Sequence, residues 1–390
     1  MTATERRATL SLAAIFALRM LGLFLVLPVF ALEVTHLPGG DDPALIGLAM
    51  GIYGLTQAVL QAPLGLASDL LGRKPVIVLG LLVFALGSVL AARAGSVQML
   101  AAARALQGAG AISAAVTALL ADLTRDEVRT KGMALIGASI AGMFALSLVL
   151  APMLAGIAGL PGLFGLTALL ALAGVALVLW MTPPEPTRQI DQTRGRLSQV
   201  WRHPHLWRLE LGVFTLHTVQ MAMWGVVPGL LVHAGLAKVQ HWQVYLPAVL
   251  ASFMALGGLF AAERRGRLRM VWRGAIALLM AVQLALLMAA AHTPGPWALG
   301  GLMFLFFTAF NVLEATQPSL ISRLAPPQAR GAALGVYNTL QSLGLFAGGA
   351  LSGWLLKSFD AQAVFAATAA LAALWLALGW RQPMSATTAH

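Results

Sequence analysis

Twelve long apolar stretches constrain the fold of this chain more than any other feature. Each contains 18 to 26 residues and is rich in Leu, Ala, Val and Gly. A helix needs about 20 apolar residues to cross a bilayer and satisfies its own backbone hydrogen bonds within the lipid. Because 59% of the residues are hydrophobic and only 10% are charged, a water-soluble core is excluded. The sequence therefore predicts an all-α membrane protein.

The predicted spans divide into two groups of six around a longer connection. Short alternating segments, which are typical of a membrane β-barrel, are absent from the sequence. We expect an N-terminal six-helix bundle at 1–182, a linker at 183–208 and a C-terminal six-helix bundle at 209–390. The predicted spans are 11–31, 44–66, 75–92, 97–121, 133–155, 163–181, 209–232, 243–262, 272–291, 297–322, 332–353 and 362–380.

The linker is rich in Arg and also contains Trp201 and Trp207. This composition fits either an amphipathic segment along the lipid headgroups or a solvated tether.

The distribution of Lys and Arg predicts the orientation in the membrane. Of the 25 Lys and Arg residues, 20 lie in or at the border of the N-terminus, the even-numbered hairpins, the linker and the tail, and 3 lie in the opposite loops. The positive-inside rule then places both termini in the cytoplasm, with the first span retained rather than cleaved as a signal peptide. The net charge of +11 is explained by this topology and by anionic lipid, so no nucleic-acid partner is expected. The absence of Cys excludes disulfides and thiolate chemistry.

The two halves repeat a short charged hairpin. Residues 69–74 (DLLGRK) and 263–268 (ERRGRL) share an acid, a Gly and an Arg at the same offsets, and each follows the second span of its half. Lys131-Gly132 and Arg330-Gly331 open the fifth and eleventh spans in the same way. Repeated bundles can rock against each other around a central site. This repeat predicts two pseudo-symmetric six-helix bundles.

The chain resembles the major facilitator superfamily over essentially its full length. The ten residues 65–74 (GLASDLLGRK) are similar to the signature loop of that family, Gly-x-x-x-Asp-x-x-Gly-Arg-Lys. The resemblance implies a conformational latch that holds an outward-open state and contains Gly65, Asp69, Gly72, Arg73, Lys74 and Asp122. Leu70 stands where the family often has Arg, so this latch has one cation fewer. The corresponding residues of the second half are Glu263, Gly266 and Arg267.

Other motifs resemble the YajR-like branch of efflux proteins in this superfamily. Residues 104–110 (RALQGAG) are similar to an element of proton-coupled members, and 19–22 (RMLG) and 310–315 (FNVLEA) fit the same branch. The fifth span matches the antiporter pattern less well, because 151–156 (APMLAG) keep only its Pro and one Gly. We expect the soluble C-terminal domain of some branch members to be missing. A bacterial cytoplasmic (inner) membrane location is implied.

Glu314 is predicted to carry the coupling proton. The other acids lie in loops, at the N-terminus or near predicted span ends, including Glu210 and Asp122. A carboxylate in a low-dielectric environment is driven toward its protonated form, so its proton affinity changes with hydration. The alternatives are a structural carboxyl paired with Arg or Asn and a direct contact to a cationic substrate.

Two Arg residues inside predicted spans need partners. Arg19 can pair with backbone carbonyls at a helix break or with a carboxylate of the opposite half. Arg104 lies one turn from Gln107, where side chains meet on one helix face. A structural clamp and a role in proton coupling remain open for both.

Polar residues at helical spacing predict the substrate cavity. Asn311 and Gln317 lie one turn on either side of Glu314, and His217 and Gln220 repeat this spacing near Trp224. Together with Gln107 they fit a cavity for a bulky, partly apolar solute. Packing within the bundle is the alternative for each of them.

These features predict a secondary transporter rather than an enzyme. The sequence has no phosphate-binding loop for ATP and no His-Glu-x-x-His metal site, so a proton gradient is the expected energy source, with no cofactor or metal. The leading hypothesis is proton-coupled efflux of small amphipathic or cationic compounds by a monomer using alternating access. The alternatives are a metabolite importer or uniporter of the same fold, and a membrane sensor or scaffold that transports nothing.

Overall fold

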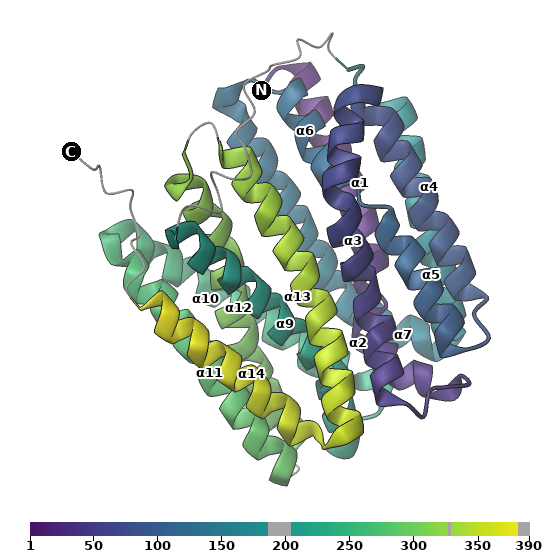
Figure 1. The fold of residues 1–390 in the computed structure, drawn as a ribbon, viewed down its shortest axis with the longest axis vertical. Coiled ribbons are helices and arrows are strands. Elements are labelled where there is room, and N and C mark those ends of the chain that lie inside the picture. The colour runs from purple at the N-terminus through teal and green to yellow at the C-terminus, as the bar shows by residue number, and fades with distance from the viewer. Residues whose placement is uncertain (186–203, 293, 327–328, 381–390) are drawn as a thin grey trace. The chain divides into compact units, whose positions relative to one another are not determined.

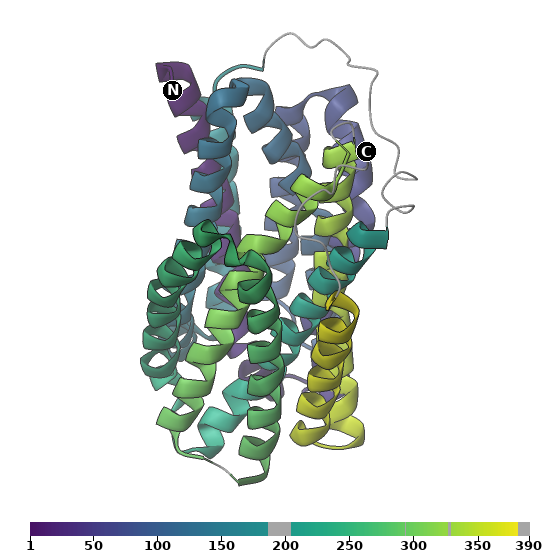
Figure 2. The same cartoon turned by 90° about the vertical axis from the view of Figure 1, so that its left-hand side faces the viewer.

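The computed structural model describes residues 1–185, 204–292, 294–326 and 329–380. In these ranges every regular element is helical and no strand occurs (Figures 1 and 2). The chain forms two compact units, Met1–Ile190 and Asp191–His390. The boundary between the units falls inside the predicted linker, most of which lies outside the described residues.

The first unit contains the six predicted spans of the N-terminal half. Its elements are α1 (Ala3–Phe24), α2 (Leu27–Glu33), the 3-10 turn η1 (Val34–His36), α3 (Pro43–Leu71), α4 (Arg73–Ala92), α5 (Val97–Ala109), α6 (Ser113–Leu123), α7 (Asp126–Ala176) and the π-helical segment η2 (Leu177–Met181). The fifth and sixth predicted spans are continuous in α7. They meet at Gly159, whose φ of 59° breaks the helix just before Pro161.

The second unit contains the other six predicted spans. Its elements are α9 (Pro204–His233), the 3-10 turn η3 (Lys238–Gln240), α10 (Trp242–Ala262), the π-helical segment η4 (Glu263–Arg267), α11 (Leu268–His292), α12 (Pro296–Leu324), α13 (Arg330–Ser358) and α14 (Ala361–Gly379). Helix α9 begins at Pro204, which is five residues before the predicted start of this span. This earlier start places Glu210 within the helix rather than at its end.

Helix packing repeats between the two units. In the first unit α1 packs on α7, α3 on α5, and α4 on α7. In the second unit α9 packs on α13, α10 on α12, and α11 on α14. Counted by span, the first–fifth, second–fourth and third–sixth pairs recur, so the internal contacts agree with the repeat in the sequence.

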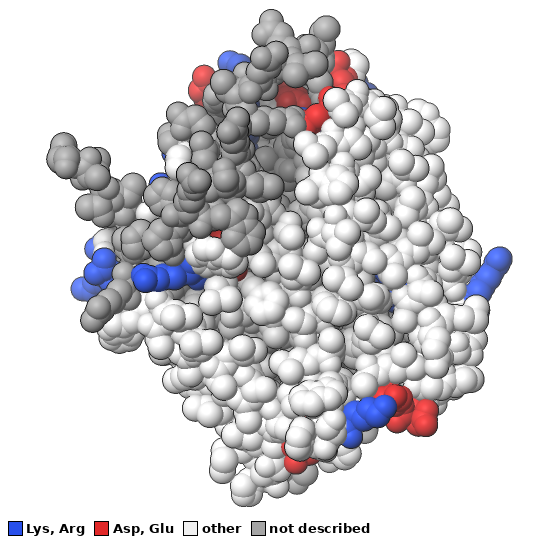
Figure 3. All heavy atoms as spheres, viewed as in Figure 1, with Lys and Arg blue, Asp and Glu red and all other residues white. Residues whose placement is uncertain are grey.

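The outer surface is apolar, as a lipid environment requires. In the described ranges nine helices are long and apolar enough to cross a membrane. Large exposed side chains include Ile157 and Met254, and Trp180 and Trp297 are exposed at helix ends. Trp is favoured at such positions because its ring suits the membrane–water interface. On the face drawn in Figure 3, charged side chains lie mostly toward the margins.

Small residues allow α9 and α13 to approach closely, and the two helices lie side by side in Figure 1. A Cβ atom added to Gly344 would lie 2.5 Å from the Phe214 carbonyl oxygen and 3.0 Å from the His217 Cβ. A Cβ added to Gly348 would lie 2.8 Å from the Met221 Cβ. Helix pairs in membranes commonly use such small residues at their contact.

Gly344→Ala is therefore expected to destabilise the protein by about 1–3 kcal/mol, because the added methyl group overpacks this contact. Gly335→Ala is the matched control on the same helix, since its new Cβ would meet no atom within 4 Å. It is expected to be neutral or to stabilise by up to about 1 kcal/mol through helix propensity. Thermal unfolding in detergent measures both, and equal shifts would contradict the close contact.

Candidate functional site

Glu314 lies at the centre of a polar cluster contributed by three helices of the second unit. Its Oε2 accepts a hydrogen bond from the Tyr337 hydroxyl at 3.3 Å, and its Oε1 accepts one from the Gln341 Nε2 at 3.2 Å. The His217 Nε2 is 3.4 Å from Oε2. The side chain of Glu314 is 35% exposed, whereas that of His217 is 3% exposed. One carboxylate in α12 therefore contacts two residues of α13 and one of α9.

The contacts of His217 indicate how a proton can be shared in this cluster. Its Nδ1 is 2.9 Å from the Val213 carbonyl oxygen, which requires a hydrogen on Nδ1. Its Nε2 lies 2.8 Å from the Gln341 amide nitrogen and accepts a hydrogen bond from it. This pattern assigns the neutral ring, whose single acceptor nitrogen, Nε2, bonds to Gln341 beside Glu314. A proton added to the cluster can bind at either Glu314 or His217.

The remaining predicted cavity residues of the second unit have different surroundings. Asn311 donates to the Ser252 hydroxyl at 2.9 Å, and Gln220 is half-buried. Gln317 is fully buried, and its amide has no partner in the described part of the chain. Trp224 is buried among the rings of Tyr245 and Phe307. The predicted role of these four residues in substrate binding stays a prediction.

Arg19 is buried in the first unit and bonds to neutral groups. Its guanidinium donates to the Tyr53 hydroxyl at 2.8 Å, to the Gly110 carbonyl at 3.3 Å and to the side chains of Gln57 and Ser113. Gly110 stands at the break between α5 and α6. Of the two pairings that the sequence left open for Arg19, bonding to a carbonyl at a helix break is present.

Arg104 and Gln107 form a clamp between three helices. Arg104 donates to the Gln107 side chain at 3.1 Å and to the Met50 carbonyl at 3.4 Å. Gln107 donates to the Ser88 hydroxyl at 2.7 Å. The Arg104 guanidinium also lies 5.2 Å from the centroid of the Tyr53 ring. These contacts join α5 to α3 and α4, which agrees with the structural alternative for both residues.

The predicted latch residues assemble around Arg73. Its guanidinium forms ion pairs with Asp69 and with Asp122, the latter at 3.2 Å, and donates to the Ser68 hydroxyl at 2.7 Å. Gly72 precedes Arg73 with a φ of 103°, a conformation that favours glycine. A Cβ added to Gly65 of α3 would lie 3.5 Å from the Cβ of Ala114 in α6, which is an ordinary contact. One guanidinium therefore joins α3, α4 and α6.

Glu185 is a further member of this cluster that sequence reasoning placed in the linker. Its carboxylate accepts the backbone N–H groups of Arg73 at 3.0 Å and of Lys74 at 2.5 Å. Lys74 also donates to the Thr182 carbonyl at 2.7 Å. An acid is favoured at a helix N-terminus because it satisfies free N–H groups and interacts with the helix dipole. The first turn of α4 is thus fastened to the end of the first bundle.

Glu185→Ala is expected to destabilise the first unit by about 1 kcal/mol, because two N–H groups of α4 lose their acceptor. Glu185→Gln keeps one acceptor oxygen and should lose less. Thermal unfolding in detergent, with the unit followed by a site-specific label, measures the difference. A Glu185→Ala protein that is as stable as the parent would show that this cap contributes nothing.

The corresponding segment of the second unit also contains a glycine with a positive φ. Gly266 has a φ of 78°, which matches the positive φ of Gly72, and Arg267 is exposed. The side chain of Glu263 lies outside the described residues. A latch role for this second hairpin stays a prediction.

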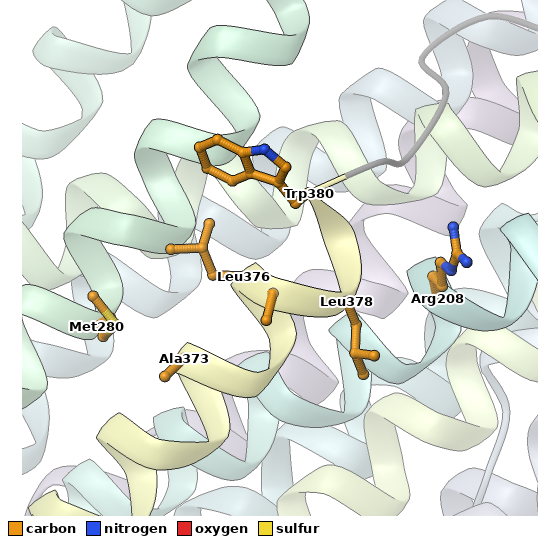
Figure 4. Close-up of a pocket in the computed structure, with 7 residues that line it drawn as sticks. Arg208, Met280, Ala373, Leu376, Leu378 and Trp380 are labelled. Atoms are coloured by element: carbon orange, nitrogen blue, oxygen red, sulfur yellow. The ribbon is translucent and has the colours of Figure 1, made fainter.

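A pocket of about 650 Å³ lies elsewhere in the second unit, next to α9, α11 and α14. Figure 4 shows residues that line it, namely Arg208, Met280, Ala373, Leu376, Leu378 and Trp380. None of these residues was predicted for substrate or proton binding, and none belongs to the Glu314 cluster. The largely apolar lining fits a surface that faces lipid.

Several residues of these clusters were missed at the sequence level. Tyr337, Gln341, Tyr53 and Ser88 are ordinary polar residues in apolar helices, and only the structure brings them to Glu314, Arg19 and Gln107. One signal was available in the composition. The chain has only three Tyr residues, and all three lie within predicted spans, where a buried hydroxyl needs a polar partner.

The helices, their repeated packing and the signature hairpin define a membrane transporter. Residues 10–349 match the family model of the Major Facilitator Superfamily, and the chain belongs to this superfamily. It is 45% identical over 381 residues to the inner membrane transport protein YajR of Escherichia coli strain K12, covering 96% of this chain and 83% of YajR. Over 138 residues it is 32% identical to the class B tetracycline resistance protein of Escherichia coli, covering 35% of this chain and 33% of that protein.

Solved structures agree on the fold. A bacterial homologue of the human lysosomal transporter Spinster, in an inward-facing and occupied conformation, matches with a TM-score of 0.80 at 15% identity and covers 100% of both chains. Together with the family match, this confirms the predicted fold class of twelve transmembrane helices in two bundles.

Membership of the family also defines the general activity. The protein is a multi-pass membrane transporter for small molecules, not an enzyme. Transporters of this superfamily generally work without a cofactor, and the described residues contain no group of three or more potential metal ligands.

Proposed function

We propose that the protein exports small amphipathic or cationic compounds from the cytoplasm in exchange for protons. The observation that carries the proposal is the Glu314 cluster, in which a partly exposed carboxylate lies 3.4 Å from the buried ring of His217. The carboxylate can bind a proton or attract a cationic substrate. It does not do both at once, because protonation removes the negative charge that attracts the cation. This competition is the physical basis of an exchange.

Export rather than import is supported by one of the relatives, because the class B tetracycline resistance protein is named for resistance to a drug. In the proposed cycle, a proton from outside the cell neutralises Glu314, and its release to the cytoplasm restores the negative charge that attracts the next substrate. Both termini lie in the cytoplasm of a bacterium, as the positive-inside rule requires.

The latch and the buried Arg residues have supporting roles in this proposal. Arg73 with Asp69 and Asp122 favours one of the two conformations of alternating access. Arg19 and Arg104 hold the first bundle together through hydrogen bonds to neutral groups. A monomer is sufficient for each step, because every contact in the cycle lies within one chain.

Purified protein in liposomes tests the proposal. A panel of lipophilic cations and amphipathic drugs, including ethidium and tetracycline, is offered to vesicles with and without an imposed pH gradient. Uptake against the concentration gradient is expected only when the vesicle interior is more acidic than the medium, because protons then leave as the substrate enters. Uptake that ignores the gradient would support a uniporter instead.

A further inference from the structure

Glu210 is a second acid in the interior of the C-terminal bundle, in addition to Glu314. Its side chain is 1% exposed, and among the described residues neither carboxylate oxygen has a hydrogen-bond partner. An ionised carboxylate without a donor is far too costly to bury, so this group carries a proton in the structure. The Glu314 cluster does not include it.

The packing of α9 on α13 places Glu210 opposite Tyr337. His217 faces Gly344, Met221 faces Gly348 and Gly225 faces Ser352, so each step of four residues on α9 matches four on α13. The residue numbers of Glu210 and Tyr337 differ by the same amount as those of each of these pairs. Glu210 lies seven residues before His217 on α9, and Tyr337 lies seven residues before Gly344 on α13. No hydrogen bond joins the two side chains, since neither oxygen of Glu210 has a partner in the described part of the chain.

Tyr337 therefore stands between two acids. Its hydroxyl contacts Glu314 at 3.3 Å, while Glu210 lies roughly 10 Å from His217 along the axis of α9. Glu210 is the seventh residue of α9, roughly 9 Å from the helix start. In the proposed orientation that start is the cytoplasmic end, so the three residues form a series from the proton site toward the cytoplasm.

We propose that Glu210 is a second proton-binding site, through which Glu314 exchanges its proton with the cytoplasm by way of Tyr337. This inference rests on the proposed proton-coupled export. The transfer takes place in a state of the transport cycle in which the Tyr337 hydroxyl contacts both acids. The Tyr337 oxygen then takes the proton of neutral Glu314 and passes its own hydrogen to the Glu210 carboxylate. Glu314 is left ionised, Glu210 is left neutral and Tyr337 is unchanged. Glu210 then loses the proton to the cytoplasm before the next transfer.

Apart from Glu314 and Tyr337, the described helices that pack on α9 offer no buried ionisable side chain as a competing route. On α12 and α13 the remaining charged residues are Arg323, Arg330 and Lys357, which are exposed and lie toward helix ends. Helix α14 also packs on α9 and contains no ionisable residue. His217 faces Glu314 and already holds the Val213 carbonyl.

Infrared difference spectroscopy of the protein in liposomes, combined with flux, tests the site. The carbonyl stretch of protonated carboxylic acids is recorded between acid and alkaline pH. We expect the parent protein to show one signal that Glu210→Gln removes and another that Glu314→Gln removes. Glu210→Gln is also expected to slow gradient-driven transport of the best panel compound by about 100-fold. Exchange of labelled for unlabelled compound should continue, because it needs no proton transfer.

Two further variants separate the relay from a structural role. Tyr337→Phe keeps the ring and both acids, so it should retain both carbonyl signals and slow coupled transport. Glu127→Gln makes the same chemical change at an exposed position and should behave as the parent.

The outcomes distinguish this inference from the proposed function. Suppose that Glu314→Gln abolishes coupling, but that Glu210→Gln has the infrared spectrum or the transport rate of the parent protein. The proposal of a second proton-binding site at Glu210 is then wrong, whereas proton-coupled export is still supported. If Glu314→Gln leaves coupled transport intact, the proposed function itself is wrong.

Discussion

Glu314→Gln is expected to abolish uphill transport while leaving downhill exchange intact. The amide keeps the size of the side chain and its contacts with Tyr337 and Gln341, but it cannot take up a proton. A pH difference of one unit is worth about 1.4 kcal/mol per proton, which sustains roughly a tenfold substrate ratio for one-to-one exchange. The variant should instead stop at a ratio of about one.

This ratio is measured in liposomes whose membrane potential is held at zero. Glu127→Gln is the matched control, because it removes one acid from an exposed position at the start of α7. The control should reach the ratio of the parent protein. A Glu314→Gln protein that still concentrates substrate would place the coupling proton elsewhere.

Arg73→Ala is expected to impair transport by changing the balance between inward-open and outward-open states. The substitution leaves Asp69 and Asp122 facing each other without the guanidinium that joins them. Coupling of this kind is typically worth about 1–3 kcal/mol, so we expect the populations to shift by roughly 5- to 150-fold. Protein amounts in the membrane should stay normal, because the spans themselves are unchanged.

The absence of native Cys allows this shift to be measured directly. Asn311→Cys supplies a single label site on α12, and its reaction with a membrane-impermeant maleimide is timed from each side. The latch is expected to hold the outward-open state. Arg73→Ala should therefore slow labelling from outside and speed labelling from the cytoplasm.

Arg73→Lys separates the latch from a role in membrane orientation. It keeps the positive charge that sets topology but loses the planar group that contacts two acids and Ser68 at once. The latch would be contradicted if Arg73→Lys showed normal labelling and transport while Arg73→Ala inserted in the inverted orientation. The positive charge would then only orient the hairpin.

The fold was largely predictable because hydrophobic length is a local property of the sequence. Each of the twelve predicted spans coincides with helix in the structure, and the repeat of the charged hairpin agrees with repeated helix packing. The positions of the breaks inside spans were not predicted. The interruption between α5 and α6 at residues 110–112 supports Arg19, and nothing in the apolar pattern marks it.

The candidate site was predictable only in part, because its geometry depends on contacts between distant helices. The sequence singled out Glu314 and His217 separately, and the structure brings them within 3.4 Å of each other. It gave no reason to choose Tyr337 or Gln341, whose partners lie on other helices. Glu210 was assigned to a span end because the start of α9 was placed five residues too late.

Proton release on ligand binding is the most direct test of the central claim that a proton and a substrate compete for Glu314. A compound of the transported panel is added to detergent-solubilised protein in unbuffered solution, and the pH is recorded. The account predicts that the parent protein releases protons into solution and that Glu314→Gln binds the compound without releasing any. Binding to the parent protein with no change in pH would contradict it.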